Sequence, residues 1–282
     1  MQPEKLVTGR MFLEAPRWRD GALYVSDMHA DEVLRISPSG QTETIASVPT
    51  QPSGLGWLPD GDMLIVSMTD RRVLRRDETG TLHEHADLSS FIGKRANDMV
   101  VDRQGRAYIG NFGFDFELGE SSASTILLRV DPDGSVQIAA DELLFPNGMV
   151  ITPDEKRLIV AQTFAQELTQ FDIDPDGSLH GRRTFATLPE GAVPDGICLD
   201  EGGGIWVASP TTQETLRIEE GGRVTHRIST GDRLSIACML GGDDGKTLYI
   251  LTAEASAREA CQKLQSAEIL IHPVELAGAG WP

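Results

Sequence analysis

The chain has 282 residues, 40% of them hydrophobic, with 29 glycines, 15 prolines and three cysteines. An odd number of cysteines without regular spacing argues against a disulfide framework or a zinc knuckle. The formal net charge of −18 would repel phosphate backbones and anionic membranes, so neither nucleic acid nor a membrane is an expected partner.

The chain starts without the apolar stretch of a signal peptide, and no apolar run is long enough to span a bilayer. These features favour a cytoplasmic protein. We also expect a monomer or a weak homo-oligomer. In chain order, residues 6–12 are expected to form a strand that pairs with C-terminal strands. Residues 253–266 are expected to form a helix inserted in the last repeat.

Between these segments one element recurs, an apolar strand that runs into a turn ending in glycine. Proline presets φ, Asp and Ser bond to their own backbone, and glycine takes the left-handed position, so each copy predicts a hairpin turn. The copies are VLRISPSG (33–40), VLRRDETG (73–80), LLRVDPDG (127–134), QFDIDPDG (170–177), TLRIEEGG (215–222) and a degenerate EILIHP (268–273).

A second element precedes each copy: a strand opened by a small or polar residue, a turn, and a hydrophobic returning strand. Its copies begin at Glu14, Pro52, Ala96, Pro146, Pro194 and Ile236. Six copies in 282 residues average about 47 residues, which matches the period of propeller repeats. The pattern predicts one all-β domain over residues 1–282, a six-bladed β-propeller with four-stranded antiparallel blades. A solenoid is the alternative, but it lacks a capping repeat.

Aligning the second elements produces a column of residues that should face the propeller axis. The column reads Glu14, Ser53, Asn97, Asn147, Asp195 and Ala237. Each oxygen-bearing residue has a simpler explanation, since Asn-Gly and Asp-Gly are ordinary turn signals. Four hard oxygen donors at one repeat position nevertheless favour a divalent cation, because converging carboxylates without one would leave charge unpaired.

Four short motifs carry a resemblance that covers nearly the whole chain. Glu14-Ala15-Pro16 with Trp18, Arg95-Ala96-Asn97-Asp98, Pro146-Asn147-Gly148 and Pro194-Asp195-Gly196 resemble the signatures of the SMP-30/gluconolactonase/luciferin-regenerating family. The resemblance implies that Glu14, Asn147 and Asp195 bind the metal, that Asn97 lies at its open side, and that Arg95 contacts substrate. Ala15 and Met99 depart from the family pattern, which has glycine at both positions.

The reaction that this resemblance implies is metal-dependent hydrolysis of a lactone or similar ester. The ion, which is Ca²⁺, Zn²⁺, Mg²⁺, Mn²⁺ or Fe²⁺, would polarise the carbonyl and activate water. Asp195 is the expected general base, and Arg95 and Asn97 are the other expected catalytic residues. The alternatives are an organophosphate or aryl-ester hydrolase, a strictosidine-synthase-like propeller, or a non-catalytic binding propeller stabilised by metal.

The expected substrate is a small lactone that is less polar than gluconolactone. Residues that follow the second strand of each blade should surround the pocket, and several of them are apolar. Met28, Met68, Phe112, Phe114 and Phe164 are therefore predicted to bind substrate together with Arg95 and Asn97. Residues 111–125 form a glycine- and serine-containing insert that is expected to act as a mobile lid. The simpler explanation is that these phenylalanines only pack the insert onto its blade.

Overall fold

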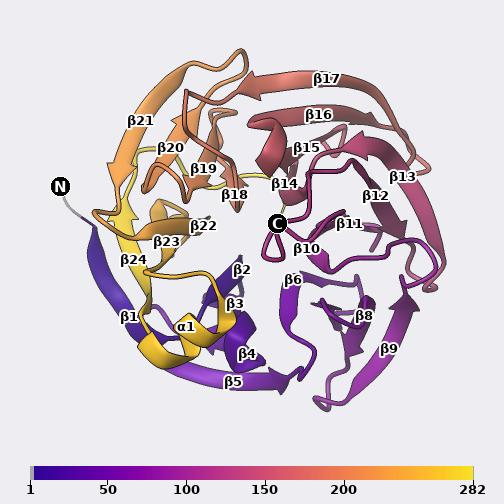
Figure 1. The fold of residues 1–282 in the computed structure, drawn as a ribbon, viewed down its shortest axis with the longest axis horizontal. Coiled ribbons are helices and arrows are strands. Elements are labelled where there is room, and N and C mark those ends of the chain that lie inside the picture. The colour runs from indigo at the N-terminus through magenta and orange to yellow at the C-terminus, as the bar shows by residue number, and fades with distance from the viewer. Residues whose placement is uncertain (1–2, 282) are drawn as a thin grey trace.

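Six four-stranded sheets surround a central axis in the computed structural model, which describes residues 3–281 (Figure 1). Neighbouring strands within each sheet are antiparallel. In blades 1 to 5 the first strand along the chain lies nearest the axis and the fourth lies at the rim. The predicted six-bladed propeller is therefore confirmed.

The strands are named in chain order, as in Figure 1. Blade 1 consists of β2 (Leu13–Arg19), β3 (Ala22–Asp27), β4 (Glu32–Ile36) and β5 (Thr42–Ser47). Blade 2 consists of β6 (Pro52–Trp57), β7 (Met63–Ser67), β8 (Arg72–Arg76) and β9 (Leu82–Asp87). Blade 3 consists of β10 (Ala96–Val101), β11 (Ala107–Asn111), β12 (Thr125–Val130) and β13 (Val136–Leu143). Blade 4 consists of β14 (Pro146–Ile151), β15 (Arg157–Gln162), β16 (Glu167–Ile173) and β17 (Leu179–Thr187). Blade 5 consists of β18 (Ile197–Leu199), β19 (Ile205–Ser209), β20 (Glu214–Ile218) and β21 (Val224–Ser229). Blade 6 consists of β22 (Leu234–Gly241), β23 (Thr247–Ala253), β24 (Ala267–Pro273) and β1 (Glu4–Arg10).

The N-terminal strand β1 completes blade 6 and so closes the ring. It pairs antiparallel with β24, from Glu4 opposite Ile271 to Arg10 opposite Ala267. The predicted pairing of residues 6–12 with the C-terminal strands is confirmed, although the strand ends at Arg10. Phe12 lies in the connection to β2, where its N–H donates to Oδ1 of Asp27 at 2.9 Å.

The predicted helical insert in the last blade is also confirmed, but it is shorter than residues 253–266. Helix α1 (Arg258–Leu264) lies between β23 and β24. It packs against the short 3₁₀ helix η1 (Met28–Ala30) of blade 1, where Nε2 of Gln262 donates to the carbonyl oxygen of His29 at 3.2 Å. A second 3₁₀ helix, η2 (Thr163–Ala165), follows β15 in blade 4.

Burial decreases from the inner strands to the outer strands of each blade. Every residue of β7, β10 and β14 is buried, because these strands lie between neighbouring blades. The rim strands β5 and β9 bury little more than one side chain each. This gradient explains why the second strands are mainly apolar, as in MLIVS (β7) and IWVAS (β19), whereas the rim strands are largely polar.

The glycine that ends each repeated strand adopts the backbone conformation that the turn prediction requires. Gly40, Gly80, Gly134, Gly177 and Gly222 all have φ between +83° and +92°. In each turn the glycine N–H donates to the carbonyl oxygen three residues earlier. The predicted hairpin turns are confirmed at all five complete copies.

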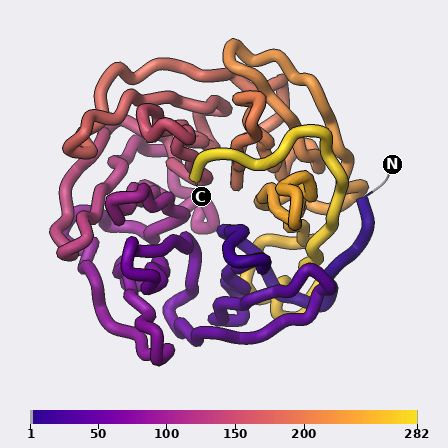
Figure 2. Tube along the Cα trace, turned by 180° about the vertical axis from the view of Figure 1, so that it is seen from behind, coloured from indigo at the N-terminus to yellow at the C-terminus, as the bar shows by residue number. Residues whose placement is uncertain are grey.

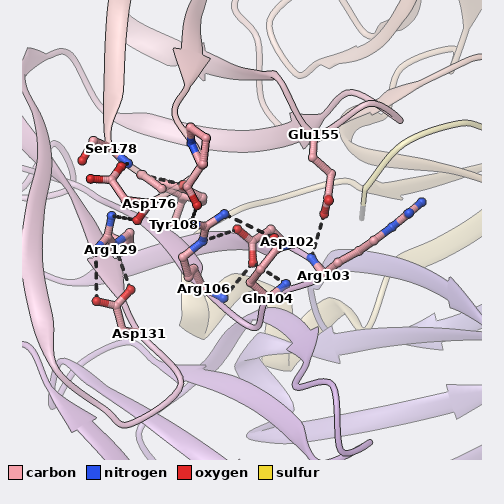
Figure 3. Close-up of polar contacts among 12 residues, drawn as sticks. Asp102, Arg103, Gln104, Arg106, Tyr108, Arg129, Asp131, Glu155, Asp176 and Ser178 are labelled. Atoms are coloured by element: carbon pink, nitrogen blue, oxygen red, sulfur yellow. Dashed lines mark hydrogen bonds and ion pairs between the residues drawn. The ribbon is translucent and has the colours of Figure 1, made fainter.

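Blade 3 holds the β16–β17 turn of blade 4 through three long side chains (Figure 3). The hydroxyl of Tyr108 donates to the carbonyl oxygen of Gly177 at 2.8 Å. Arg106 and Arg129 donate to the carbonyl oxygens of Pro175 and Asp176, while Asp102 and Asp131 respectively pair with the two guanidinium groups. Polar contacts therefore supplement the apolar packing between these blades, to which the ring of Tyr108 also belongs.

The C-terminal segment crosses one end of the axis. Seen from behind in Figure 2, it runs from the edge of the ring to the centre. Ala277, Ala279 and Trp281 bond to the backbone of blades 4 and 5, including a mutual pair of hydrogen bonds between Trp281 and Ile151. Ile151 is the last residue of β14, so this end of the inner strands is covered and the opposite end is available for a site.

Among residues 3–281, no helix combines the length and the apolar character needed to cross a bilayer.

Candidate active site

Irregular pairing marks the start of the inner strand in five of the six blades. In five blades the register between the first and second strands shifts, at Glu14/Arg17, Pro52/Leu55, Ala96/Met99, Pro146/Met149 and Ser235/Ala237. A bulge interrupts the ladder locally and redirects a side chain. In blades 1, 3 and 4 this irregularity lies at or beside Glu14, Asn97 and Asn147. In blade 5 the strand β18 begins after Asp195, and its pairing with β19 is regular.

A cavity of about 280 Å³ lies at this end of the axis. Four of the six column residues line it, namely Glu14, Asn97, Asn147 and Asp195. Ser53 and Ala237 are buried and are absent from the lining. Side chains from blades 1, 3, 4 and 5 thus meet in one cavity, although they are up to 181 residues apart in the chain (195 − 14).

Direct hydrogen bonds connect part of this group. The Nδ2 atom of Asn147 donates to Oδ1 of Asp195 at 2.5 Å and to Oγ1 of Thr163 at 3.2 Å. The Nδ2 atom of Asn97 donates to the carbonyl oxygen of Pro146 at 3.4 Å. The Asn147 carboxamide therefore contacts Asp195 directly, whereas Asn97 is held from the neighbouring blade.

The two carboxyl groups of the site are hard to ionise together. Burial raises the pKa of Asp195 to about 8, and the nearby Asp98 adds to this effect while the Asn147 hydrogen bond opposes it. Burial also raises the pKa of Glu14 well above its ordinary value, and the charges of Asp195 and Asp98 raise it further. Two carboxylates in one desolvated site repel each other, and each disfavours the charged form of its neighbour.

These residues fit a cation that prefers oxygen ligands. Among residues 3–281, neither Glu14 nor Asp195 forms an ion pair, because Arg17 pairs with Asp98 and Arg95 pairs with Glu117. Carboxylate and carboxamide oxygens are ligands for hard divalent ions. The same described residues contain no group of three or more His, Cys, Asp and Glu side chains placed to hold a metal. Any ion bound here would therefore depend on the Asn147 carboxamide as well as on the two carboxylates.

Two glycines beside the site allow the inner strands to approach closely. A Cβ atom on Gly148 would lie 2.6 Å from the nitrogen of Ile197 and 2.7 Å from the carbonyl oxygen of Asp195. A Cβ atom on Gly196 would lie 2.4 Å from Cβ of Ala237. Neither glycine has a positive φ, and Gly148 lies within β14. The Asn-Gly pair is therefore a strand contact, and the explanation as a turn signal is wrong there.

Replacing Gly148 by alanine is expected to disturb both stability and catalysis. The new methyl group meets backbone atoms that cannot rotate away, so we expect a loss of about 1–3 kcal/mol in the free energy of unfolding. Because the peptide carrying Asp195 must shift, kcat should fall by about 100-fold. Urea unfolding and steady-state kinetics measure the two effects. Gly93→Ala, where a Cβ would meet nothing within 4 Å, is the matched control and should change neither.

The two departures from the family pattern have different environments. Ala15 has φ of +48°, the left-handed conformation that favours glycine, and it follows Glu14 in the bulge of β2. Met99 is fully buried and packs directly against Gly54. Its side chain therefore lies in the core and does not line the cavity. The methionine at position 99 therefore changes the core and leaves the wall of the cavity unaltered.

Apolar residues form much of the remaining wall. Met28, Phe112 and Phe164, which the sequence analysis assigned to substrate binding, line the cavity. Phe114 and Met68 do not line it. Both are buried. Phe114 lies against the rings of Phe145 and Phe164, and Met68 lies in the core cluster shared by blades 1 to 3, 5 and 6. These two residues pack the protein behind the wall. For Phe114 this is the simpler explanation, in which the phenylalanines of the insert only pack it onto its blade.

Arg95 lies at the cavity beside the insert between β11 and β12. Its guanidinium pairs with Glu117 at 3.0 Å and stacks over the ring of Phe112 at 5.7 Å. Lys94 pairs with Glu120 of the same insert at 2.6 Å. Two adjacent cations thus hold Glu117 and Glu120 at the rim, within the insert that is predicted to be a lid.

Other lining residues were not assigned to substrate binding from the sequence. Phe145 is buried between β13 and β14 with φ of +59°, and nothing in its sequence context marks it. His29 lines the cavity and bonds through both ring nitrogens, to the carbonyl oxygen of Ser256 at 2.9 Å and to Nε2 of Gln51 at 3.1 Å. His29 follows β3, the second strand of its blade, so the rule that predicted Met28 as a pocket residue could also have predicted His29.

Residues 12–254 match the model of the SMP-30/gluconolactonase/LRE-like region. The chain belongs to this family. The match spans the ring from the connection before β2 to the end of β23, and it includes every motif of the candidate site.

Known members and solved structures agree with this assignment. The pentonolactonase XacC of Haloferax volcanii is 26% identical over 277 residues, which cover 95% of this chain and 92% of that protein. A solved gluconolactonase from Xanthomonas campestris is 25% identical, with a TM-score of 0.74, over 96% of this chain and 89% of that one. The solved regucalcin of Agrobacterium tumefaciens, described as a calcium-binding protein, is 23% identical, with a TM-score of 0.81, over 97% and 93%. This last similarity concerns the fold.

Proposed function

We propose that this protein is a metal-dependent hydrolase that opens a lactone. The observation that supports the proposal most directly is the meeting of Glu14, Asn97, Asn147 and Asp195 in one cavity with Arg95 at its edge. The family relatives named above as pentonolactonase and gluconolactonase act on lactones, which supports the same reaction class. A purely structural ion site would need neither an adjoining cavity nor a cationic side chain beside it.

Glu14, Asn147 and Asp195 are the residues that would hold the cation. When bound, a divalent ion supplies Lewis-acid polarisation of an ester carbonyl and a lowered pKa for water. The carboxylates of Glu14 and Asp195 supply the opposite charge that such an ion requires. The oxygen of the Asn147 carboxamide is the third donor, since among residues 3–281 only the nitrogen of this group forms a hydrogen bond.

The protein's own side chains accept the proton from water and orient the substrate. Water attacks the carbonyl carbon, and the carboxylate of Asp195 accepts its proton. The guanidinium of Arg95 and the carboxamide of Asn97 orient the carbonyl and stabilise the negative charge that develops on its oxygen. The ring C–O bond then breaks, the departing oxygen takes up the proton, and a hydroxy acid is released. Arg95 must exchange its Glu117 partner for the substrate during this sequence.

Activity before and after chelation tests the proposal. Purified protein is assayed with lactones, aryl esters and organophosphates, then treated with chelator and assayed again with Ca²⁺, Mg²⁺, Mn²⁺, Zn²⁺ or Fe²⁺ restored. We expect lactone turnover that is lost on chelation and returns with at least one ion. Absence of turnover under every condition would refute the enzyme, and turnover unaffected by chelation would refute its metal dependence.

Thermal unfolding gives a second readout that does not depend on substrate. The folded pKa of Asp195 is raised from 3.8 to about 8, so without cation this group lowers stability as pH rises from about 4 to 8. Cation binding requires the deprotonated carboxylates. We therefore expect the added ion to raise Tm more at pH 8 than at pH 5. An equal shift at both pH values would indicate binding elsewhere.

A further inference from the structure

We infer that the substrate is a lactone bearing an apolar alkyl or aryl substituent rather than a polyhydroxylated sugar lactone. The inference rests on the proposed lactone hydrolysis and names its substrate class. Two features of the cavity support it. Apolar groups line the cavity on both sides of the polar cluster formed by Glu14, Asn97, Asn147 and Asp195, and polar side chains elsewhere in the wall already form hydrogen bonds or ion pairs within the protein.

One side of the cavity is a cluster of phenyl rings from blades 3 and 4. Phe112, Phe116 and Phe164 line the cavity around Phe145, whose ring centroid lies 4.4 to 5.7 Å from theirs. Phe116 and Phe164 are 42% and 43% exposed, which is unusual for rings in an otherwise well-buried group. Exposed apolar surface concentrated at a cavity marks a place for an apolar ligand group.

The wall contributed by blades 1 and 6 is apolar as well. Phe12 and Met28 belong to blade 1 or its approach, and Leu234 and Ile236 belong to β22. The substrate would therefore meet carbon atoms on both sides, and oxygen atoms of Glu14, Asn97 and Asp195 at the reacting group. The flexible thioether of Met28 can adapt this wall to substituents of different shape.

Four polar side chains in the rest of the lining, those of Thr163, Thr211, His29 and Arg95, are already bonded to the protein. The hydroxyl groups of Thr163 and Thr211 donate to the carbonyl oxygens of Pro194 and Gly191. Both ring nitrogens of His29 are engaged, and the Arg95 guanidinium pairs with Glu117. Sugar hydroxyls transferred from water would find few free partners here, and unpaired polar groups weaken binding.

The size of the cavity limits the substituent. A volume of about 280 Å³ is at the small end of ligand pockets, so it accommodates a single lactone ring with a short chain or a fused aromatic ring. The two exposed phenyl rings are the groups that such a substituent would contact. Phe145 also lines the cavity, but it is buried and packs against both rings, so it acts as a positioning residue for them.

Turnover and binding are measured separately on the metal-loaded protein. Initial rates, corrected for spontaneous ring opening, compare δ-octalactone and dihydrocoumarin with glucono-δ-lactone. Calorimetry compares the corresponding lactams, which bind but resist hydrolysis. We expect kcat/KM to favour the apolar lactones by about tenfold or more, since a few apolar contacts are sufficient for that discrimination. The lactams should show the same order of affinity.

Two substitutions test the phenyl wall itself. Phe116→Ser and Phe164→Ser should each lower kcat/KM for δ-octalactone by about tenfold and change that for glucono-δ-lactone by less than about twofold. Phe91→Ser is the matched control, because Phe91 is 39% exposed and does not line the cavity. Phe91→Ser should leave both values unchanged, and circular dichroism checks that all three variants are folded.

The possible failures are distinguishable. Higher kcat/KM for glucono-δ-lactone, together with tighter binding of its lactam, would overturn the apolar substrate class while lactone hydrolysis stands. Equal loss on both lactones in the Phe116 and Phe164 variants would also overturn it, since the rings would then serve folding alone. Absence of lactone turnover with tight binding of the apolar lactam would refute the proposed reaction and retain the wall as an apolar ligand site.

Discussion

Asp195→Asn is expected to abolish most of the turnover while the protein remains folded. The substitution keeps an oxygen donor next to Asn147, but it removes one negative charge and the group proposed to accept the proton from water. Loss of a general base typically costs about 10²–10⁴-fold in rate, so kcat should fall by at least about 100-fold. Steady-state kinetics at saturating metal measure the effect, and calorimetry with the same ion shows whether the site remains loaded.

Two further variants separate the role of base from the role of ligand. Glu14→Gln removes a charge but no proposed base, so excess metal should restore much more of its activity than that of Asp195→Asn. Asp141→Asn changes an exposed aspartate on the rim strand β13 and should behave like the unmodified protein. Full activity of metal-loaded Asp195→Asn would remove Asp195 from the role of base.

Arg17→Met is expected to cause the largest loss of stability among single changes near the site. The Arg17 side chain pairs with Asp98 at 2.6 Å and donates to the carbonyl oxygens of Leu55 and Met99, which joins blades 1, 2 and 3. Both charged side chains are more than 90% buried. Removing one partner of a buried pair leaves the other charge uncompensated, so we expect a loss of about 3–5 kcal/mol in the free energy of unfolding.

Equilibrium unfolding in urea measures this loss, and two variants interpret it. Arg17→Met combined with Asp98→Leu removes both charges and should recover most of the stability, because apolar replacement of a buried pair is often neutral. Arg223→Met breaks a pair whose arginine is 72% exposed and should cost about 0–1 kcal/mol. If Arg17→Met cost no more than Arg223→Met, the buried pair would not be the joint between these blades.

The architecture could be predicted from the sequence because every blade repeats the same local signals. Each hairpin turn depends on a few neighbouring residues, and Gly40 and Gly134 adopt the same φ as their equivalents in other blades. The closing strand was also predictable, since six repeats in a ring leave one outer position to fill. Its end at Arg10 was not, because the contact of Phe12 with Asp27 is a tertiary interaction that periodicity does not encode.

The candidate site was partly predictable for the same reason. Glu14, Asn97, Asn147 and Asp195 share one repeat position, so alignment of the blades places them together without a structure. Phe145 and Met68 show where this reasoning fails. Phe145 lines the cavity from a connection outside the repeated pattern, and Met68 has the expected place after a second strand but is covered by the core. Which side chains reach a cavity depends on how connections fold over it.

The way in which the ring is closed also determines when it can form during synthesis. Strand β1 is synthesised before every other strand of the ring, yet β24, the strand beside it among the described residues, begins at residue 267. At about 5–20 residues per second, the nascent β1 remains unpaired for on the order of ten seconds to a minute. An unpaired apolar strand would be a hazard for aggregation during this time. In β1 only Val7 is buried, and the strand otherwise carries mainly charged and polar side chains. Its composition suits a segment that must stay in water until the last blade has been made.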